Sequence, residues 1–555
     1  MSHVANQDVG QRRKDETGHW SLVVGRWSAY GLIGLAVAAF VGYLIVYVIY
    51  AVALFQFPFD YDQGEGYELV DTILFSQGEW PYRDIDHYPF YSSNYPPVFH
   101  LAIVPLVWLF GPHYWTGRLV SFVGTLITAA AISYAVHRES GQPRRRWWLT
   151  AVAGLAFLAS NYVYHVGPLF RQHMFMVMLE TLAVVLLAVT IDREEADGRR
   201  RHWHLLGVMV LLLLAGYTKQ LAYATVATVF IFLFLRQVKR AVIWAVPFAA
   251  VTGLIFLWIN LSTDGQWLLN TITANLNPFV PEQAIGLYRQ WFQLHTVLIL
   301  VAGGLAVYQL YFERLSVYTI WFAFAVVNSV TAGTWGAGES YFATAIAASC
   351  ILTGLAFNRL LDWSENERRP VWLGTAMLLA IPILLLVQAD KLFHMPTHTP
   401  ALQAIAAGLG KPTEIWVPPQ TSCSAPRPAE RIPYVDSVGP TLLGRPPNAQ
   451  DTAAGRQIAA MIAASGKAAF SEEAGFNLYA GQEVVTNPTQ LLNLYQAGAV
   501  DLTKMLQMLD EKRFDHIILR AQFYPPPVLD MIGQRYITTD LVQMNGFVYC
   551  VMQPR

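Results

Sequence analysis

The sequence predicts a polytopic α-helical membrane protein with about 11 to 13 transmembrane helices, followed by a small extracytoplasmic α/β domain. Hydrophobic residues make up 54% of the 555 positions, and the mean hydropathy is +0.35, which is typical of polytopic membrane proteins. Apolar runs close to the roughly 18–20 residues needed to cross the hydrocarbon core recur over the first 390 positions. After residue 390, Pro, Gly and polar residues become frequent, which indicates a change of domain.

The apolar runs define the expected spans in chain order. We expect them near 31–55, 118–136, 148–165, 173–191, 205–235 (two short spans), 241–261, 294–312, 315–332, 341–358 and 371–390. The shorter run 98–110 is ambiguous. The topology is consistent only if this run does not fully cross the membrane or if another segment re-enters it.

The basic connections predict the orientation of the protein. Arginine clusters lie in the connections Arg144–Arg146, Arg199–Arg201, Arg236–Arg240 and Arg368–Arg369, and such connections stay on the cytosolic side. The polar segment 1–25 lacks a signal-peptide cleavage pattern and is expected to be a cytosolic tail. This orientation places the first loop, 57–97, and the C-terminal region outside the cytosol.

The C-terminal region is expected to comprise a linker, 391–450, and an α/β domain, 451–555. Helices are predicted at Asp451–Ala464 and Asp501–Lys512, each with its first Asp as N-cap, and strands at Phe514–Leu519, Tyr536–Val542 and Phe547–Met552.

Two further features of the C-terminal region leave alternatives open. Cys423 and Cys550 can form a disulfide in an oxidising compartment, although two unbridged thiols are the simpler alternative. Ser471-Glu472-Glu473 is expected to be a solvated strand end rather than the lining of a cleft.

Three carboxylates lie within six residues, directly after the first long apolar run: Asp60, Asp62 and Glu65. Gly64 and Gly66 lie beside them and indicate a specific backbone path rather than only a solvated acidic surface. A carboxylate in such a loop is suited to act as a general base.

Three other segments bring charge to the same expected face. Arg171 precedes one span, Lys219-Gln220 separates the two halves of 205–235, and Glu339 precedes Ser340 and Tyr341. Lys and Arg at this depth are suited to bind a phosphate at headgroup level. Alternatively, the two cations extend to phospholipid headgroups, and Glu339 caps a helix.

The sequence assigns no metal ligand. His87, His100 and His113 match no ligand spacing, so we expect them to be structural. The D-x-D pairs, Asp60 with Asp62 and Asp84 with Asp86, provide hard oxygen ligands that suit Mg²⁺ or Mn²⁺. No cofactor is required by the predicted chemistry, and a divalent cation stays an open alternative.

Several short motifs, taken in order, resemble those of the GT-C membrane glycosyltransferases, in particular the protein-mannosyltransferase and aminoarabinose-transferase-like branch. They are Asp62-Gln63-Gly64-Glu65-Gly66, Gly78-Glu79-Trp80-Pro81-Tyr82-Arg83-Asp84, Asn94-Tyr95-Pro96-Pro97, Gly117-Arg118-Leu119-Val120-Ser121, Arg171, Thr218-Lys219-Gln220 and Glu339-Ser340-Tyr341-Phe342. The resemblance covers 26–390 and implies that this region is a GT-C-like catalytic domain.

The resemblance implies an inverting transfer of a hexosyl or pentosyl group from a polyprenyl-phosphate donor. The acceptor would be a glycan, lipid or protein at the extracytoplasmic face of a bacterial inner membrane. A carboxylate of the first loop would be the general base, either Asp62 or Glu65. Many relatives have an Asp where this chain has His173, so the role of that Asp does not transfer.

The resemblance also implies roles for the remaining candidates. Lys219, Arg171 and Gln220 would bind the donor phosphate, and Asp84, Glu339 and Tyr341 would position the acceptor or the loop.

Two other functions compete with this interpretation. A transporter or flippase of lipid-linked glycans is disfavoured because we find no internal repeat and the charges gather at one face. A non-catalytic glycolipid binder would keep the cations but would not need a base. The formal net charge of −1 gives no indication of a nucleic-acid partner.

Overall fold

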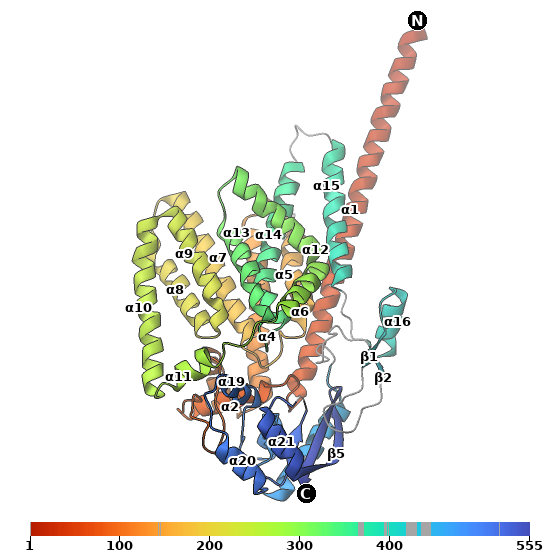
Figure 1. Ribbon diagram of the computed structural model, residues 1–555. Coiled ribbons are helices and arrows are strands. Elements are labelled where there is room, and N and C mark those ends of the chain that lie inside the picture. Colours follow the sequence, from red (N-terminus) through yellow and green to blue (C-terminus); the bar gives the residue numbers. More distant parts are fainter. Residues whose placement is uncertain are drawn as a thin grey trace.

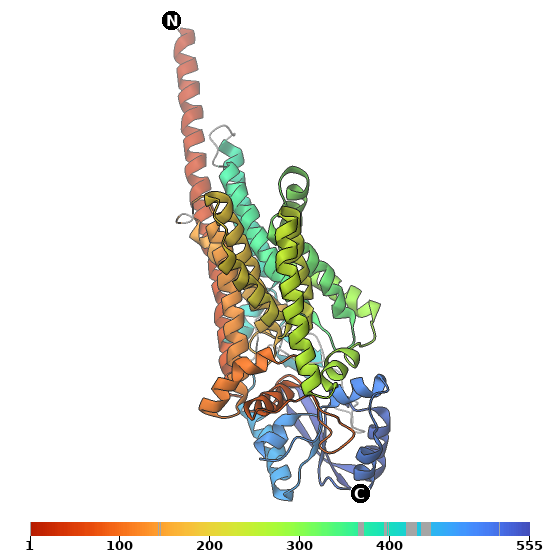
Figure 2. The ribbon, with the colours of Figure 1, turned by 90° about the vertical axis from the view of Figure 1, so that its left-hand side faces the viewer.

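The computed structural model describes residues 2–142, 144, 146–364, 371–392, 397, 399–417, 430–433, 446–520 and 522–555. Long helices run along a common direction and form a bundle, and a small α/β domain covers one end of it (Figures 1 and 2). The N-terminus and the C-terminus lie at opposite ends of the molecule (Figure 1).

The helices of the bundle agree with the apolar runs. In the described part of the chain, seven helices are long and apolar enough to cross a membrane. They lie in α1 (Ser2–Gln56), α4 (Tyr114–Arg138), α7 (His173–Asp197), α10 (Val238–Ser262), α12 (Pro281–Phe312), α14 (Ala343–Ser364) and α15 (Val371–Lys391). Shorter apolar helices include α3 (Val98–Phe110), α5 (Trp147–Ala159), α8 (His202–Gly216), α9 (Tyr223–Arg236) and α13 (Val317–Asn328). The run 205–235 is therefore two helices, as predicted.

Helix α3, the ambiguous run, stays at one end of the bundle. At its start, the Val98 amide donates to the Tyr217 carbonyl at 2.9 Å. Near its end, Trp108 Nε1 donates to the Ser76 carbonyl at 3.0 Å, at the C-terminus of α2 (Glu65–Ser76). Because both ends are bound to the same region, α3 does not traverse the bundle.

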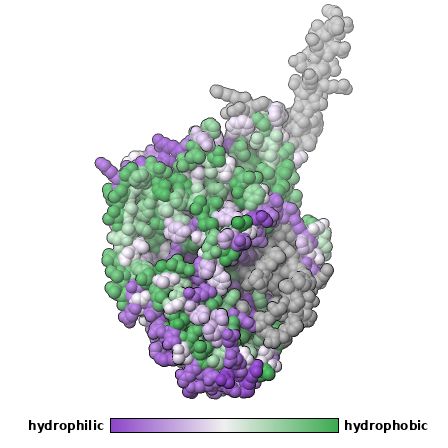
Figure 3. All heavy atoms as spheres, in the orientation of Figure 1, coloured by the Kyte–Doolittle hydropathy of each residue, from purple (hydrophilic) through white to green (hydrophobic). Residues whose placement is uncertain are grey.

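The outer surface of the bundle is strongly apolar, as Figure 3 shows for one face. On α10, Ile243, Val246, Leu254 and Trp258 are each more than 60% exposed, at 67%, 63%, 65% and 61%. Such a continuous apolar surface is unfavourable in water and favourable in lipid. The chain is thus a multi-pass membrane protein.

The C-terminal domain has the predicted mixture of helices and strands. Its helices are α17 (Ala449–Ser465), α18 (Ala474–Tyr479), α19 (Pro488–Gln496), α20 (Thr503–Asp510) and α21 (Pro526–Arg535), and its strands are β3 (Phe470–Ser471), β4 (Ile517–Leu519), β5 (Tyr536–Met544) and β6 (Phe547–Pro554). The sheet order is β3-β4-β6-β5, with β3 parallel to β4 and the other pairs antiparallel.

The predicted N-caps were wrong in detail. Asn448 is the N-cap of α17, and Asp451 is the third helical residue of a capping box that it forms with Asn448. Leu502 precedes α20, and Asp501 instead accepts a hydrogen bond from the Thr503 amide at 2.9 Å.

The segment predicted as a linker contains α16 (Pro400–Gly408) and an antiparallel pair of strands, β1 (Glu414–Val417) and β2 (Glu430–Pro433). Cys423 lies outside the described residues, whereas Cys550 is disulfide-bonded and Cys350 is free and buried.

The first loop packs against the C-terminal domain. Ile85 and Phe90 belong to the same apolar core as Phe470, Leu491 and Ile517 of that domain. The first loop, which follows α1, therefore lies against the C-terminal domain.

Candidate active site

The three carboxylates after α1 lie in three different environments because the backbone turns sharply between them. Gly64 has φ +99°, and a Cβ there would lie 3.0 Å from both Nη atoms of Arg171. Glycine is required at this position for its conformation and for the close approach of the guanidinium. Helix α2 begins at the next residue, so Glu65 points into the bundle while Asp62 stays at the edge of the loop.

Asp62 forms an ion pair with Arg171. Its Oδ2 accepts from Arg171 Nε at 2.9 Å and from Nη2 at 2.7 Å, and the two side chains are 19% and 21% exposed. Arg171 also donates to the Gln63 carbonyl and lies 3.4 Å from Glu68 Oε1 through Nη1. Burial disfavours the charged guanidinium, but Asp62 and Glu68 outweigh it and raise the pKa of Arg171.

Glu65 is fully buried against Arg118 of α4. Its Oε1 accepts from Arg118 Nε at 2.9 Å and from the Phe170 amide at 2.7 Å. Its Oε2 accepts from Arg118 Nη2 at 2.8 Å and from the Tyr61 amide at 2.9 Å. Although burial opposes ionisation, Arg118 holds the pKa of Glu65 below its usual value. Both oxygens are therefore used within the protein.

Asp60 is also fully buried and links the bundle to the C-terminal domain. Its Oδ1 accepts from the Gly66 amide at 2.6 Å. Its Oδ2 accepts from the Tyr114 hydroxyl at 2.7 Å and from the Gly475 amide, in the first turn of α18, at 2.9 Å. Burial raises the pKa of Asp60. This carboxylate has a structural role between the two parts of the chain.

Lys219 lies in the connection between α8 and α9. Its Nζ is 3.1 Å from His173 Nδ1, 5.0 Å from the ring centre of Tyr341 and 5.4 Å from that of Tyr95. Burial and the charge of Arg171 lower the pKa of Lys219 to about 7. Within the described residues, no carboxylate lies within ion-pair distance of Nζ, so this cation is available to an anionic ligand.

The other predicted residues have partners of their own. Glu339 lies 2.8 Å from His165 Nε2 through Oε1, and Ser340 Oγ is 3.5 Å from His173 Nδ1. Gln220 Nε2 donates to the Thr271 carbonyl at 3.0 Å. Asp84 is exposed, accepts a hydrogen bond from the Asp86 amide at 3.0 Å and lies 3.9 Å from His87 Nδ1 through Oδ2.

A second buried cluster, which was not predicted from the sequence, lies beside Arg171. Glu68 and Asp71 lie one turn apart on α2, and His100 of α3 faces them. The spacing of the two acids was a usable signal, because residues i and i+3 share a helix face. Burial raises the pKa of Glu68 to about 8 and that of Asp71 to about 7.

Glu472 and Glu473 are buried, so the expected solvated strand end is wrong. Glu473 forms an ion pair with Arg520 and accepts from the Tyr549 hydroxyl. Glu472 accepts from the amides of Arg520 and Phe523. These contacts hold strand ends of the domain together.

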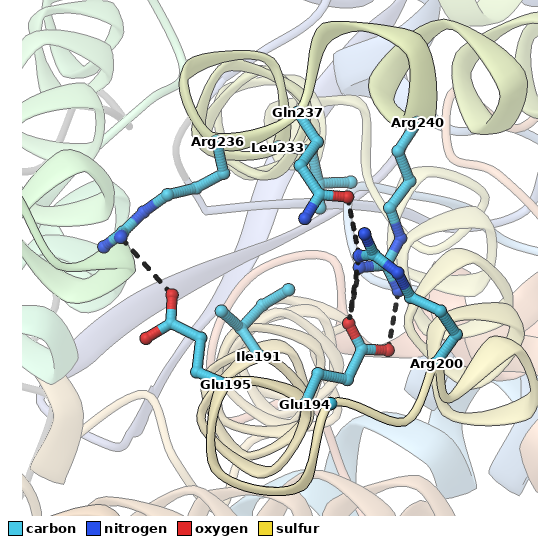
Figure 4. Close-up of a pocket in the computed structure, with 9 residues that line it drawn as sticks. Ile191, Glu194, Glu195, Arg200, Leu233, Arg236, Gln237 and Arg240 are labelled. Atoms are coloured by element: carbon cyan, nitrogen blue, oxygen red, sulfur yellow. Dashed lines mark hydrogen bonds and ion pairs between the residues drawn. The ribbon is translucent and has the colours of Figure 1, made fainter.

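A separate pocket of about 180 Å³ lies at the far end of α7 (Figure 4). Glu194 there accepts from Arg240 at 2.6 and 2.8 Å, and Glu195 lies 3.5 Å from Arg236. The charged side chains that line this pocket form ion pairs with one another, whereas Lys219 has no carboxylate partner among the described residues.

Comparison with solved structures shows what the chain resembles. ArnT from Cupriavidus metallidurans bound to undecaprenyl phosphate has 15% identity and a TM-score of 0.55, over 93% of this chain and 98% of ArnT. The apo state of the same protein has 16% identity and a TM-score of 0.54, over 94% and 98%. The apo oligosaccharyltransferase from Archaeoglobus fulgidus has 11% identity and a TM-score of 0.48, over 86% of this chain and 69% of the oligosaccharyltransferase.

No family model and no curated protein matches the sequence, so the resemblance is one of structure. ArnT is an aminoarabinose transferase of the GT-C superfamily, and the likeness extends over nearly the full length of both chains. The predicted architecture is thereby confirmed: this chain is a multi-pass membrane protein with the GT-C fold.

Proposed function

We propose that this protein transfers a sugar from a polyprenyl-phosphate donor to an acceptor at the extracytoplasmic face of the inner membrane. The observation that carries the proposal is the position of Lys219, a cation without a carboxylate partner among the described residues, in the same region as the Asp62–Arg171 pair. The ArnT structure with undecaprenyl phosphate bound supports the class of donor.

Asp62 is the proposed general base. Arg171 engages its Oδ2 through two hydrogen bonds, so Oδ1 is assigned to the acceptor proton. The acceptor oxygen or nitrogen attacks the anomeric carbon as Oδ1 takes its proton, and the bond between that carbon and the phosphate oxygen breaks. The electron pair stays on the leaving polyprenyl phosphate, whose charge Lys219 stabilises. A single displacement inverts the anomeric carbon.

Glu65 is not the base in this proposal, because its oxygens already accept hydrogen bonds and the side chain is fully buried. Arg171 orients Asp62 through the two hydrogen bonds to Oδ2 and supplies positive charge beside the donor phosphate. Gln220 supports the donor side. Glu339, Tyr341 and Asp84 are assigned to the positioning of the acceptor or the loop, and the ring of Tyr341 also lies against Lys219.

The orientation rests on the arginines at the far end of the bundle. Arg200, Arg236 and Arg240 lie around the distant pocket (Figure 4). Basic connections stay in the cytosol, and this rule supports an extracytoplasmic position for Asp62 and the C-terminal domain.

The test uses purified protein in nanodiscs, a panel of undecaprenyl-phosphate-linked hexoses and pentoses, and an envelope extract as the source of acceptor. The readout is release of undecaprenyl phosphate. Asp62→Asn should reduce transfer by about 10²–10⁴-fold, the usual contribution of a general base, while it retains undecaprenyl phosphate. Lys219→Ala should weaken binding of undecaprenyl phosphate.

The control is Glu79→Gln, which removes an exposed carboxylate of the same loop and should leave transfer unchanged. Transfer at the wild-type rate by Asp62→Asn would rule out this base. Binding of undecaprenyl phosphate that is equal in wild type and Lys219→Ala would rule out the donor site.

A further inference from the structure

Helices α2 and α3 bring three metal-ligating side chains together in the protein interior. Glu68, Asp71 and His100 are 2%, 2% and 0% exposed. His100 Nε2 lies 3.4 Å from Glu68 Oε2 and 3.8 Å from Asp71 Oδ2, and one ligand atom from each residue lies within 4.8 Å of the others.

A hydrogen-bond chain determines which nitrogen of His100 carries its proton. Thr72 Oγ1 donates its only hydrogen to the Glu68 carbonyl at 2.8 Å. The same oxygen lies 3.2 Å from His100 Nδ1, so it can only accept there, and Nδ1 must donate. In the neutral ring this leaves Nε2 without a proton, and its lone pair faces the two carboxylates.

With both carboxylates ionised, three acceptor atoms face one another and repel unless a cation lies between them. Among the described residues, neither Glu68 Oε2 nor His100 Nε2 has a hydrogen-bond partner, although both atoms are buried. Buried polar atoms are rarely left in this state, because the lost hydration is not recovered. The unpartnered atoms therefore point to a ligand.

We propose that Glu68, Asp71 and His100 bind a divalent transition-metal cation, for which Zn²⁺ is the best fit. Zn²⁺ takes one nitrogen and two oxygen ligands at about 2.0–2.1 Å, and a tetrahedral arrangement of such bonds separates the ligand atoms by about 3.3 Å. The 3.4 Å between His100 and Glu68 is close to this value. The imidazole disfavours Mg²⁺ and Ca²⁺, which select oxygen.

Outer hydrogen bonds around the cluster have the pattern of a metal site. Asp71 Oδ1 accepts from the Tyr91 hydroxyl at 2.8 Å, and its Oδ2 accepts from Ser93. Together with Thr72 on His100, these contacts orient two of the three ligands, as outer-shell partners do in metalloproteins.

The cation would have a positioning role. The two oxygens of Glu68 have different neighbours. Oε2 lies 3.4 Å from His100 Nε2, and Oε1 lies 3.4 Å from Arg171 Nη1. A metal on Oε2 would hold this carboxylate in place and, through Arg171, would position Asp62. The metal site itself does not depend on the proposed transfer reaction.

The experiment measures metal binding directly, without a donor. Full-length protein in nanodiscs is stripped with a chelator, dialysed and titrated with Zn²⁺, and bound metal is counted by plasma mass spectrometry. Co²⁺ serves as a spectroscopic probe, since its visible absorption reports coordination by nitrogen and oxygen. Wild type should bind one equivalent, and Thr72→Val, which keeps the packing, should bind it about 10–100-fold more weakly.

Two histidine variants make the test specific. His100→Gln should lose the tight equivalent and the Co²⁺ spectrum, whereas His113→Gln, an exposed histidine outside the cluster, should keep both. The proposal would be overturned if the wild type takes up no Zn²⁺. It would also be overturned if both His100→Gln and Thr72→Val still bind one equivalent of Zn²⁺ tightly. A folded Thr72→Val protein with the wild-type affinity would overturn the tautomer argument and the site that depends on it.

Discussion

Glu65 and Arg118 form a two-point ion pair in the interior, with Nε to Oε1 at 2.9 Å and Nη2 to Oε2 at 2.8 Å. Arg118 also donates to the carbonyls of Leu54, Phe57 and Phe59, which are the last turn of α1 and the chain after it. The pair thus connects α1, α2 and α4 and holds the loop in which Asp62 lies. Because of this pair, Glu65 is buried and fully hydrogen-bonded, unlike Asp62 three residues earlier in the chain.

Glu65→Gln should lower the thermal stability of the protein. Removing one partner of a buried ion pair costs about 3–5 kcal/mol, since the other charge is left uncompensated. Thermal unfolding of purified protein, followed by tryptophan fluorescence, measures the effect. Asp62→Asn, whose side chain is partly exposed, should unfold within a few degrees of wild type. An unchanged unfolding temperature for Glu65→Gln would contradict the structural role of the pair.

Binding of the donor should weaken as the pH rises through about 7, where Lys219 loses its proton. The charged amine, present below this pH, attracts the phosphate, and the loss approaches about tenfold per pH unit above it. An undecaprenyl-phosphate sugar is the suitable probe, because its phosphodiester does not titrate in this range. Lys219→Arg keeps its charge, so its affinity should change less than that of wild type between pH 6 and pH 8. The same pH dependence in the two proteins would exclude Lys219 as the phosphate ligand.

The ring of Tyr341 should contribute to donor binding through Lys219. Its centre lies 5.0 Å from Nζ, and a cation–π contact contributes about 0.5–2 kcal/mol, so Tyr341→Ala should bind about 2- to 30-fold more weakly. Tyr341→Phe keeps the ring and should bind like wild type in the same equilibrium measurement. If the phenylalanine variant is impaired as strongly as the alanine variant, the hydroxyl rather than the ring is responsible.

Gly475→Ala should loosen the contact between the C-terminal domain and the bundle. A Cβ at this position would lie 2.5 Å from Asp60 Oδ2 and 2.6 Å from the Tyr114 hydroxyl, so the hydrogen bonds of Asp60 must break or shift. Hydrogen exchange should then increase in α18 and in the loop before α2. Gly533→Ala in the same domain is the control, since a Cβ there meets nothing within 4 Å. Equal exchange in the two variants would contradict this role of Asp60.

Much of the fold follows from local patterns. The apolar runs predicted the helices of the bundle, including the division of 205–235. A segment that crosses lipid must be apolar over its whole length and must satisfy its own backbone hydrogen bonds, so the pattern is local in the sequence. Short runs of β-branched and aromatic residues predicted β4, β5 and β6, because such side chains favour strands. The N-caps were misplaced, since the choice between Asn448 and Asp451 depends on backbone geometry at one residue.

The sequence by itself determined that acids gather where α1 ends, but it could not assign their roles. Asp60, Asp62 and Glu65 look alike locally, yet Gly475, Arg171 and Arg118 contact them from 415, 109 and 53 residues away. Only the tertiary structure brings these partners together, as it does Glu68, Asp71 and His100. The behaviour of a carboxylate is decided by its burial and by the charges and donors within a few ångströms, and here distant segments supply them.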